Sequence, residues 1–444
     1  DTEDEQYSRF LKTWELQKLV KKYSDYIRYP IKLEMEKSRM KEETKDSDKP
    51  EYETYTENET LNSMVPLWQR AKKDITPEEY NNFYKEKFFD FEDPIATIHV
   101  SVEGAVTYKA LLYIPARAPY DFYTKDFKKG LQLYSSGVMI MENCADLLPD
   151  CFRFVRGVVD SQDLSLNISR EMLQHDRQLK FIAGNLEKKI KTELQKLMDN
   201  DREKYEKFFA AFGPQIKYGV LADYGAKKET LQDLLLYWSS KQGKLISLKE
   251  YVAAMPEDQK YIYYANGESR EALLQLPQME KLQQKGCDVL FMTDEVDGFV
   301  PQTLAKYQEK ELKAITAGDL GLETEEEKKA AEEKSEKSKQ TLEFVKKTLG
   351  EQVKDVRLSD NLGSHPVSVV PDGGMTFEME KYFKRMNPEA GMKADRILEL
   401  NADHPIFAKL QIAVAQDEKK AEDLVKILYT QALLMAGLPV ENAG

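Results

Sequence analysis

Residues 97–114 read TIHVSVEGAVTYKALLYI and decide the fold of the first part of the chain. Apolar and polar side chains alternate over 97–102, and a second apolar run covers 108–114, so we expect two strands. Residues 138–141 predict a further strand. Helices packed on one side of these strands would give an α/β sandwich.

A helix is expected just before these strands. Thr76-Pro77-Glu78-Glu79 combines an N-cap, a first-turn proline and a capping-box glutamate. The inner face of that helix is aromatic and consists of Tyr80, Phe83, Tyr84 and Phe88. Residues 171–202 also predict a helix, and Asp223 begins a loop before a helix that runs through 231–238.

The N-terminal part has its own pattern. Apolar residues from Phe10 to Ile27 recur at helical spacing, and Tyr29-Pro30 should end that helix. A strand is expected at 31–35. Residues 36–60 are polar and dense in charge, which predicts an exposed hairpin or loop.

Strands at 261–264 and 289–292 indicate a second α/β unit. Residues 323–339 are nearly all Glu, Lys, Ala and Ser, which predicts a solvated helix between two domains, with a disordered linker as the alternative. We therefore predict an α/β (α+β) protein, with two αβα sandwich subdomains joined by a helical segment and a mixed α/β C-terminal domain. The predicted boundaries are 1–238, 239–322 and 323–444.

Bulk composition excludes several classes of protein. A net charge of −13 argues against nucleic-acid binding and against binding to an anionic membrane. No apolar run approaches the roughly 18 residues that span a bilayer, and the charged start at Asp1 is unlike a signal peptide. We expect a cytoplasmic protein with neither nucleic acid nor membrane as a partner.

No complete catalytic set of residues stands out. The sequence has no glycine-rich phosphate loop, no Gly-x-Ser-x-Gly turn and no His/Cys cluster, so we expect neither a metal site nor an independent hydrolase. The cysteines lack metal-ligand spacing and predict reduced, buried thiols. They are Cys144, Cys151 and Cys287. We expect His99, His365 and His404 to be surface or packing residues.

The segment LSLNISREMLQ, which ends at Gln174, breaks a rule of helix starts. Ser169 is a natural N-cap, so Arg170 falls in the first turn, where the helix dipole disfavours a cation by some tenths of a kcal/mol. Gln174 lies one turn later and could face an anionic ligand together with the guanidinium. The alternative is an ion pair of Arg170 with Glu171 or Asp163.

A methionine-rich segment follows Asp372-Gly-Gly. Its apolar residues fall on one helical face and are Met375, Met379, Tyr382, Phe383 and Met386. Methionine suits a surface that accepts many shapes, so the pattern predicts a polypeptide-binding face. A buried core stripe would give the same pattern.

The last helix is strongly amphipathic. One face carries Ala421, Leu424, Val425, Leu428, Ala432 and Met435, widened by Ile427 and Leu434. Gly437 and Pro439 should end it. A face this broad needs two neighbours. One of them would be a partner subunit, although a core helix of a monomer would look the same.

Residues 153–174, RFVRGVVDSQDLSLNISREMLQ, resemble the middle-domain signature of the heat shock protein 90 family. Similar segments run along the whole chain, namely KKYSDYIRYPI (21–31), LNSMVPLW (61–68), SVEG (101–104), GESREA (267–272) and LELNADHP (398–405). The chain is identified as a member of this family in its bacterial form. It resembles the middle and C-terminal parts without the N-terminal ATP-binding domain.

This resemblance implies one half of a split ATPase. In the family, the matching arginine reaches the γ-phosphate of ATP held by the N-terminal domain, and the matching glutamine and asparagine order that loop. We therefore expect these roles for Arg170, Gln174 and Asn167. An arginine supplied from outside the nucleotide pocket stabilises charge on the transferred phosphoryl group. ATP with Mg²⁺ would serve the intact protein, and this chain alone would bind neither.

The resemblance also implies partners. The face from Met375 to Met386 matches a client-binding helix, Phe299 matches an aromatic client contact, and Tyr120 lies in the patch that docks the N-terminal domain. Expected partners are client polypeptides, the protein's own N-terminal ATPase domain and a second copy, but no acidic-tail co-chaperone. The homodimer would form through the C-terminal dimerisation domain at Leu424, Val425, Leu428, Ala432 and Met435.

Some positions depart from the family pattern. Gly298 stands where relatives often carry glutamate, and residues 134–137 lack two arginines that are common there. The sequence stops at Gly444, before the family's last bundle helix. A different reading of the chain is a passive dimerising scaffold whose methionine stripe is core.

Overall fold

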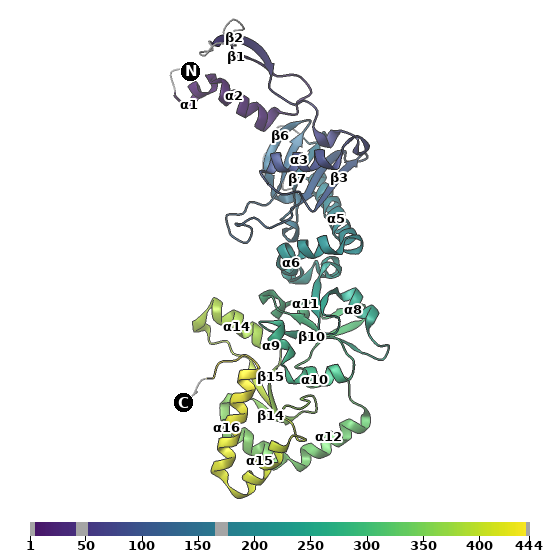
Figure 1. Ribbon diagram of the computed structural model, residues 1–444, viewed down its shortest axis with the longest axis vertical. Coiled ribbons are helices and arrows are strands. Elements are labelled where there is room, and N and C mark those ends of the chain that lie inside the picture. The colour runs from purple at the N-terminus through teal and green to yellow at the C-terminus, as the bar shows by residue number, and fades with distance from the viewer. Residues whose placement is uncertain (1–4, 41–51, 165–175, 441–444) are drawn as a thin grey trace. The chain divides into compact units, whose positions relative to one another are not determined.

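The computed structural model describes residues 5–40, 52–164 and 176–440 (Figure 1). The chain is mixed α/β, which confirms the predicted α+β class. It divides into two compact units, Asp1–Phe212 and Gly213–Gly444. The predicted domain boundaries after residues 238 and 322 both lie inside the second unit and stay predictions.

The first unit opens with short helices and a hairpin. The helices are α1 (Glu5–Ser8), η1 (Arg9–Leu11), α2 (Thr13–Leu19) and η2 (Val20–Ser24). Strand β1 (Lys32–Met40) pairs antiparallel with β2 (Tyr52–Thr60), with Lys32 opposite Thr60. The charge-dense segment therefore contributes strands longer than the sequence predicted. No side chain of either strand is fully buried, as expected of a two-stranded ribbon.

The body of the first unit is a five-stranded sheet in the order β3-β4-β7-β5-β6. Its strands are β3 (Ala96–Val102), β4 (Tyr108–Ile114), β5 (Leu131–Ser135), β6 (Val138–Cys144) and β7 (Arg156–Ser161). The antiparallel pairing of β3 with β4 confirms the two strands predicted from residues 97–114. Strands β5 and β7 run parallel, so the sheet is mixed.

Two helices of the first unit show how its sequence forms a core. Helix α3 (Pro77–Phe88) begins with the predicted capping box. Its Tyr84 packs with Trp68, Tyr113 and Tyr134 in an aromatic core cluster. Helix α5 (Arg177–Asn200) buries an apolar stripe at three- and four-residue spacing, Leu179, Ile182, Leu186, Ile190, Leu194 and Met198. Sheet and helices thus form the predicted α/β layer arrangement.

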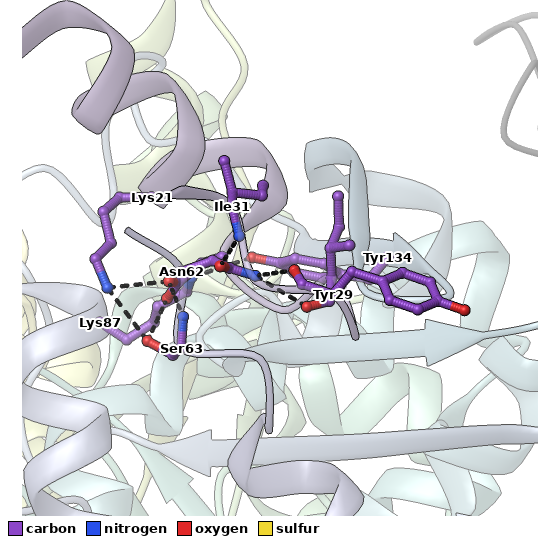
Figure 2. Close-up of polar contacts among 9 residues, drawn as sticks. Lys21, Tyr29, Ile31, Asn62, Ser63, Lys87 and Tyr134 are labelled. Atoms are coloured by element: carbon purple, nitrogen blue, oxygen red, sulfur yellow. Dashed lines mark hydrogen bonds and ion pairs between the residues drawn. The ribbon is translucent and has the colours of Figure 1, made fainter. Parts of the chain in front are cut away.

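Figure 2 shows a polar junction that joins residues 21–31 to Asn62 and Ser63, which follow β2. The Asn62 side chain accepts from the Ile31 amide at 2.7 Å and donates to the carbonyls of Ile27 and Tyr29, each at 2.9 Å. The Asp25 carboxylate accepts from the amide of Ser63 and lies 3.0 Å from Lys21 Nζ. Asn62 is buried, so its amide replaces water for three backbone groups.

The second unit begins within helix α6 (Arg202–Gly225). The backbone of this helix is not helical at 222–224, in agreement with the loop predicted at Asp223. A six-stranded sheet follows in the order β12-β13-β10-β11-β8-β9. Its strands are β8 (Leu236–Ser239), β9 (Lys244–Ser247), β10 (Tyr261–Asn266), β11 (Leu290–Met292), β12 (Lys306–Tyr307) and β13 (Lys310–Ala314). Its helices are α7 (Lys228–Leu231), α8 (Leu248–Ala254), α9 (Arg270–Leu274), α10 (Pro277–Gln284) and α11 (Val300–Leu304).

The helix predicted through 231–238 is wrong. Helix α7 ends at Leu231, a 3-10 turn covers Gln232–Leu234, and β8 starts at Leu236. A short run of apolar residues fits a buried strand as well as a buried helix, and periodicity cannot separate them. Pairing with both β9 and β11 decides for the strand.

The C-terminal part of the second unit starts with two helices, α12 (Glu325–Lys337) and α13 (Lys339–Leu349). The helix predicted in the charged segment is therefore confirmed, and it has a complete capping box at Thr324. A three-stranded sheet in the order β14-β16-β15 is combined with three further helices. These elements are β14 (Asp355–Leu358), β15 (Val367–Asp372), α14 (Phe377–Met386), β16 (Asp395–Leu400), α15 (Pro405–Gln416) and α16 (Glu418–Met435).

Candidate functional site

Helix α14 carries most of the predicted client-binding residues. Thr376 is its N-cap and accepts from the Met379 amide at 3.1 Å, with Glu378 and Glu380 in the first turn. Gly373 and Gly374, which precede the helix, are exposed and have no side chains that could pack against it. Met375 was predicted on the helical face, but it precedes the N-cap and lies outside the helix.

Exposure differs strongly along the predicted face. Met379 is only 9% exposed, Tyr382 and Phe383 are half-buried, and Met386 is 70% exposed. Phe299, between η9 (Glu295–Gly298) and α11, meets this face. Its ring lies edge-on to Tyr382 and Phe383, with centroids 5.3 Å and 5.9 Å away. The structure thus joins the two predicted client-contact segments in one aromatic cluster.

A buried ion pair holds α14 against the C-terminal sheet. Glu380 Oε1 accepts from the Arg396 guanidinium at 2.9 Å, and its other oxygen accepts from the Ala394 amide at 2.8 Å. Both charged side chains are buried, so each supplies the partner that the other needs away from water. At the surface, Lys381 pairs with Glu268 at 3.0 Å. The helix is fixed from two sides.

A second buried ion cluster supports Phe299. Lys217 Nζ lies 2.8 Å from a carboxylate oxygen of Asp297 and 2.8 Å from one of Asp294, and the Tyr237 hydroxyl donates to Asp297 at 3.3 Å. Burial raises the pKa of Asp297, and the nearby Lys217 acts in the opposite direction. Burial also raises the pKa of Tyr237 well above its usual value. Sequence reasoning missed this cluster, although Lys217 is a lone cation among apolar residues of α6.

The predicted dimer residues divide by exposure. Val425, Leu428 and Ala432 lie in the core of the C-terminal part, and Leu424 and Met435 are half-buried. The exposed apolar side chains of α16 are Ile427 at 62% and Leu434 at 65%. A partner subunit would therefore meet a face next to the predicted one, and the dimer itself stays a prediction.

The predicted catalytic residues Arg170, Gln174 and Asn167 lie outside the described residues. Asp163, which the sequence offered as a partner for Arg170, accepts from the Thr107 amide at 2.7 Å. Tyr120, the predicted docking residue, is fully exposed. No group of three metal-ligating side chains occurs among the described residues. Within the same ranges, no helix has the length and apolar character needed to cross a membrane.

The thiols and two of the histidines have structural environments. Cys144, Cys151 and Cys287 are buried, as predicted, and each is a thiol rather than half of a disulfide. His99 is buried, with Nδ1 2.7 Å from the Tyr80 hydroxyl and Nε2 3.1 Å from the Trp68 carbonyl oxygen. His404 accepts from the Ile406 amide and caps α15. Both histidines are packing or capping residues.

Comparison with known proteins defines the family. A family model described as "Hsp90 protein" matches residues 41–444. Relatives described as "Chaperone protein HtpG" include those of Clostridium acetobutylicum, 53% identical over 442 residues, Clostridium perfringens strain 13, 52% over 440, and Bacillus subtilis, 50% over 442. The matches cover 99–100% of this chain and 70% of each relative.

The family model and these relatives support the role of a molecular chaperone. Within that class, the chain belongs to the Hsp90 family.

Proposed function

We propose that this chain is the client-binding and dimer-forming part of a bacterial Hsp90 chaperone, and that it supplies Arg170 to an ATPase completed by an N-terminal domain. Client binding is supported chiefly by the aromatic cluster of Phe299, Tyr382 and Phe383. Met386, one helical turn after Tyr382 on α14, is 70% exposed. Flexible methionine beside half-buried rings gives an apolar surface that adapts to unlike sequences.

Client affinity tests the first part of this proposal. The double variant Phe383→Ala/Met386→Ser should weaken binding of a permanently unfolded, carboxymethylated protein by about tenfold, because it removes apolar contact area. Fluorescence anisotropy gives the dissociation constant, and circular dichroism checks the fold. The matched control is Leu274→Ser, which removes an exposed apolar side chain from α9. Equal affinity of the double variant and the unmodified chain would refute client binding here.

ATP hydrolysis tests the second part. Mixing this chain with the separate N-terminal domain should give ATPase activity, and Arg170→Ala should lower kcat by about tenfold or more, since a supplied arginine stabilises the transition state. Arg177→Ala is the control, because it removes the next arginine along the chain. Unchanged hydrolysis with Arg170→Ala would remove this role.

One observation favours a second candidate function. Met379 is 9% exposed, which suits a passive dimerising scaffold whose methionine stripe is core. The two functions predict different labelling. A client-binding helix that opens should let Met379 oxidise in the folded protein, and a scaffold should protect it. Oxidation followed by mass spectrometry separates them.

A further inference from the structure

A cavity of about 720 Å³ lies behind helix α14 in the second unit. It is lined by residues of α13, α14, α16 and the segment 387–396. On α14 it is lined by Glu380 and Lys384, one helical turn apart, whereas Tyr382 and Phe383 contact Phe299. The cavity and the aromatic cluster therefore occupy different faces of the same helix.

The cavity is strongly basic. Four cationic side chains line it, Lys384, Lys393, Arg396 and Lys426, against the single carboxylate of Glu380, which leaves a net charge of +3. Arg396 and Glu380 are buried and bonded to each other. Lys384 and Lys426 are exposed, and neither forms an ion pair with a described residue. Their charge is available to an incoming anion.

The remaining lining is partly apolar. It includes Leu349, Met392, Tyr429, Leu433 and Val440. The Tyr429 hydroxyl donates to the Gln352 carbonyl at 3.1 Å, which fixes the ring as a wall of the cavity. A ligand that fills this space would displace water from both the basic and the apolar lining side chains. It should therefore carry anionic groups for the first and apolar groups for the second.

The backbone around the cavity favours carboxylates on an extended chain over a single phosphate. Phosphate sites commonly use the amides of a helix N-terminus. Here the lining residues Thr348 and Leu349 end α13, and those of α16 lie between Lys426 and Leu433, well inside that helix. The cations also come from two helices, from β16 and from the loop before β16, which suits several carboxylates along a peptide.

We propose that this cavity binds acidic amphipathic segments of client polypeptides, in which Asp or Glu lies beside apolar residues. The inference rests on the proposed client binding and adds a substrate preference to it. With a net charge of −13, the chain as a whole repels acidic segments. A local basic cavity beside α14 supplies the attraction that the rest of the surface lacks.

Two labelled peptides test this preference in the full chain. One carries glutamates beside leucine and phenylalanine, and in the other every glutamate is glutamine. Lys384→Glu/Lys426→Glu should weaken the acidic peptide by about tenfold and leave the neutral one within about twofold. The matched control is Lys409→Glu/Lys420→Glu, which makes the same charge change at exposed lysines outside the cavity. Raising the salt concentration should lower the affinity of the acidic peptide to that of the neutral one, and should leave the affinity of the neutral peptide unchanged.

The possible outcomes separate this inference from the proposed function. If both peptides bind equally well and Phe383→Ala/Met386→Ser weakens both, client binding stands and the acidic preference is wrong. If neither peptide binds, the proposed client binding also fails. Competition by inorganic phosphate as effective as by the acidic peptide would instead indicate a small-anion site and overturn the peptide assignment.

Discussion

At the scale of single residues, Asn62 shows how one buried side-chain amide stabilises the backbone around it through three hydrogen bonds. Asn62→Ala should lower the free energy of unfolding of the first unit by about 2–4 kcal/mol, because it removes three hydrogen bonds and strands the Ile31 amide. Urea denaturation measures this, and hydrogen exchange should show lost protection at Ile31. Asn58→Ala, an exposed asparagine on β2, is the matched control and should have little effect. Retained protection at Ile31 in Asn62→Ala would contradict the assignment.

Glu79 gives a residue-scale prediction about pH. The hydrogen bond from the Thr76 amide and the Arg70 guanidinium lower its pKa from 4.5 to about 2. A carboxylate whose pKa is lower in the folded state stabilises that state above pH 4.5, and the contribution disappears as the pH falls to about 2. The stability advantage of the unmodified chain over Glu79→Gln should shrink across that window. Thermal unfolding at several pH values measures it.

The control for that prediction is Glu78→Gln in the same first turn of α3. Glu78 forms no ion pair with a described residue, so its substitution should alter the pH profile much less. Identical profiles for the two variants would mean that the capping box does not carry the effect.

At the scale of elements, the ion cluster between α6 and η9 is the clearest case of tertiary structure that depends on charge. Lys217→Met should cost about 3–5 kcal/mol at neutral pH, because it leaves the fully buried Asp297 carboxylate without its cation. The loss of unfolding free energy should be smaller at acidic pH, because a protonated Asp297 is neutral and needs no cation. Lys217→Met/Asp297→Asn should recover most of the stability.

Lys207→Met in the same helix is the control for that prediction. Lys207 is exposed and pairs with Glu203 one turn away, so its loss should cost at most about 0.5 kcal/mol. Chemical denaturation followed by circular dichroism measures the free energy of unfolding of both variants. Equal effects of the two single variants would show that burial of Lys217 does not matter.

The same elements show what sequence could predict. The capping box at Thr76 and the alternation at 97–102 act within a few residues, so α3 and β3 follow from local chemistry. The strand β8 needed its neighbours β9 and β11, which no local pattern reveals. The contact of Phe299 with Tyr382 joins distant segments and depends on the folded second unit. Resemblance predicted the two segments, but not that they touch.

At the scale of the whole molecule, net charge and local charge have opposite signs. The chain carries −13, whereas the cavity behind α14 carries +3 among its lining side chains. The net charge of the chain follows from composition alone, because it is a count of charged residues. The local charge depends on folding, which brings together Lys384 of α14, Lys426 of α16 and Lys393 of the loop before β16. The net charge of the whole chain therefore does not decide whether a local surface attracts an acidic peptide.

Self-association is the prediction that concerns the molecule as a whole. Ile427 and Leu434 are seven residues apart on one exposed face of α16, so they are the apolar side chains that a second copy could cover. Ile427→Glu/Leu434→Glu should abolish a dimer at tens of micromolar with the fold intact, because charges buried at an interface lack partners. Sedimentation equilibrium measures the association.

Two comparisons make that experiment decisive. Ile412→Glu places a charge on an equally exposed apolar position of α15 and should leave the dimer unchanged. Leu428→Ala, inside the core, should instead lower the free energy of unfolding by about 2–5 kcal/mol through a cavity. A strictly monomeric unmodified chain would remove the dimer prediction. A dimer that survives both glutamates would place the interface on another face, since Leu428 and its buried neighbours cannot reach a partner while the core stays folded.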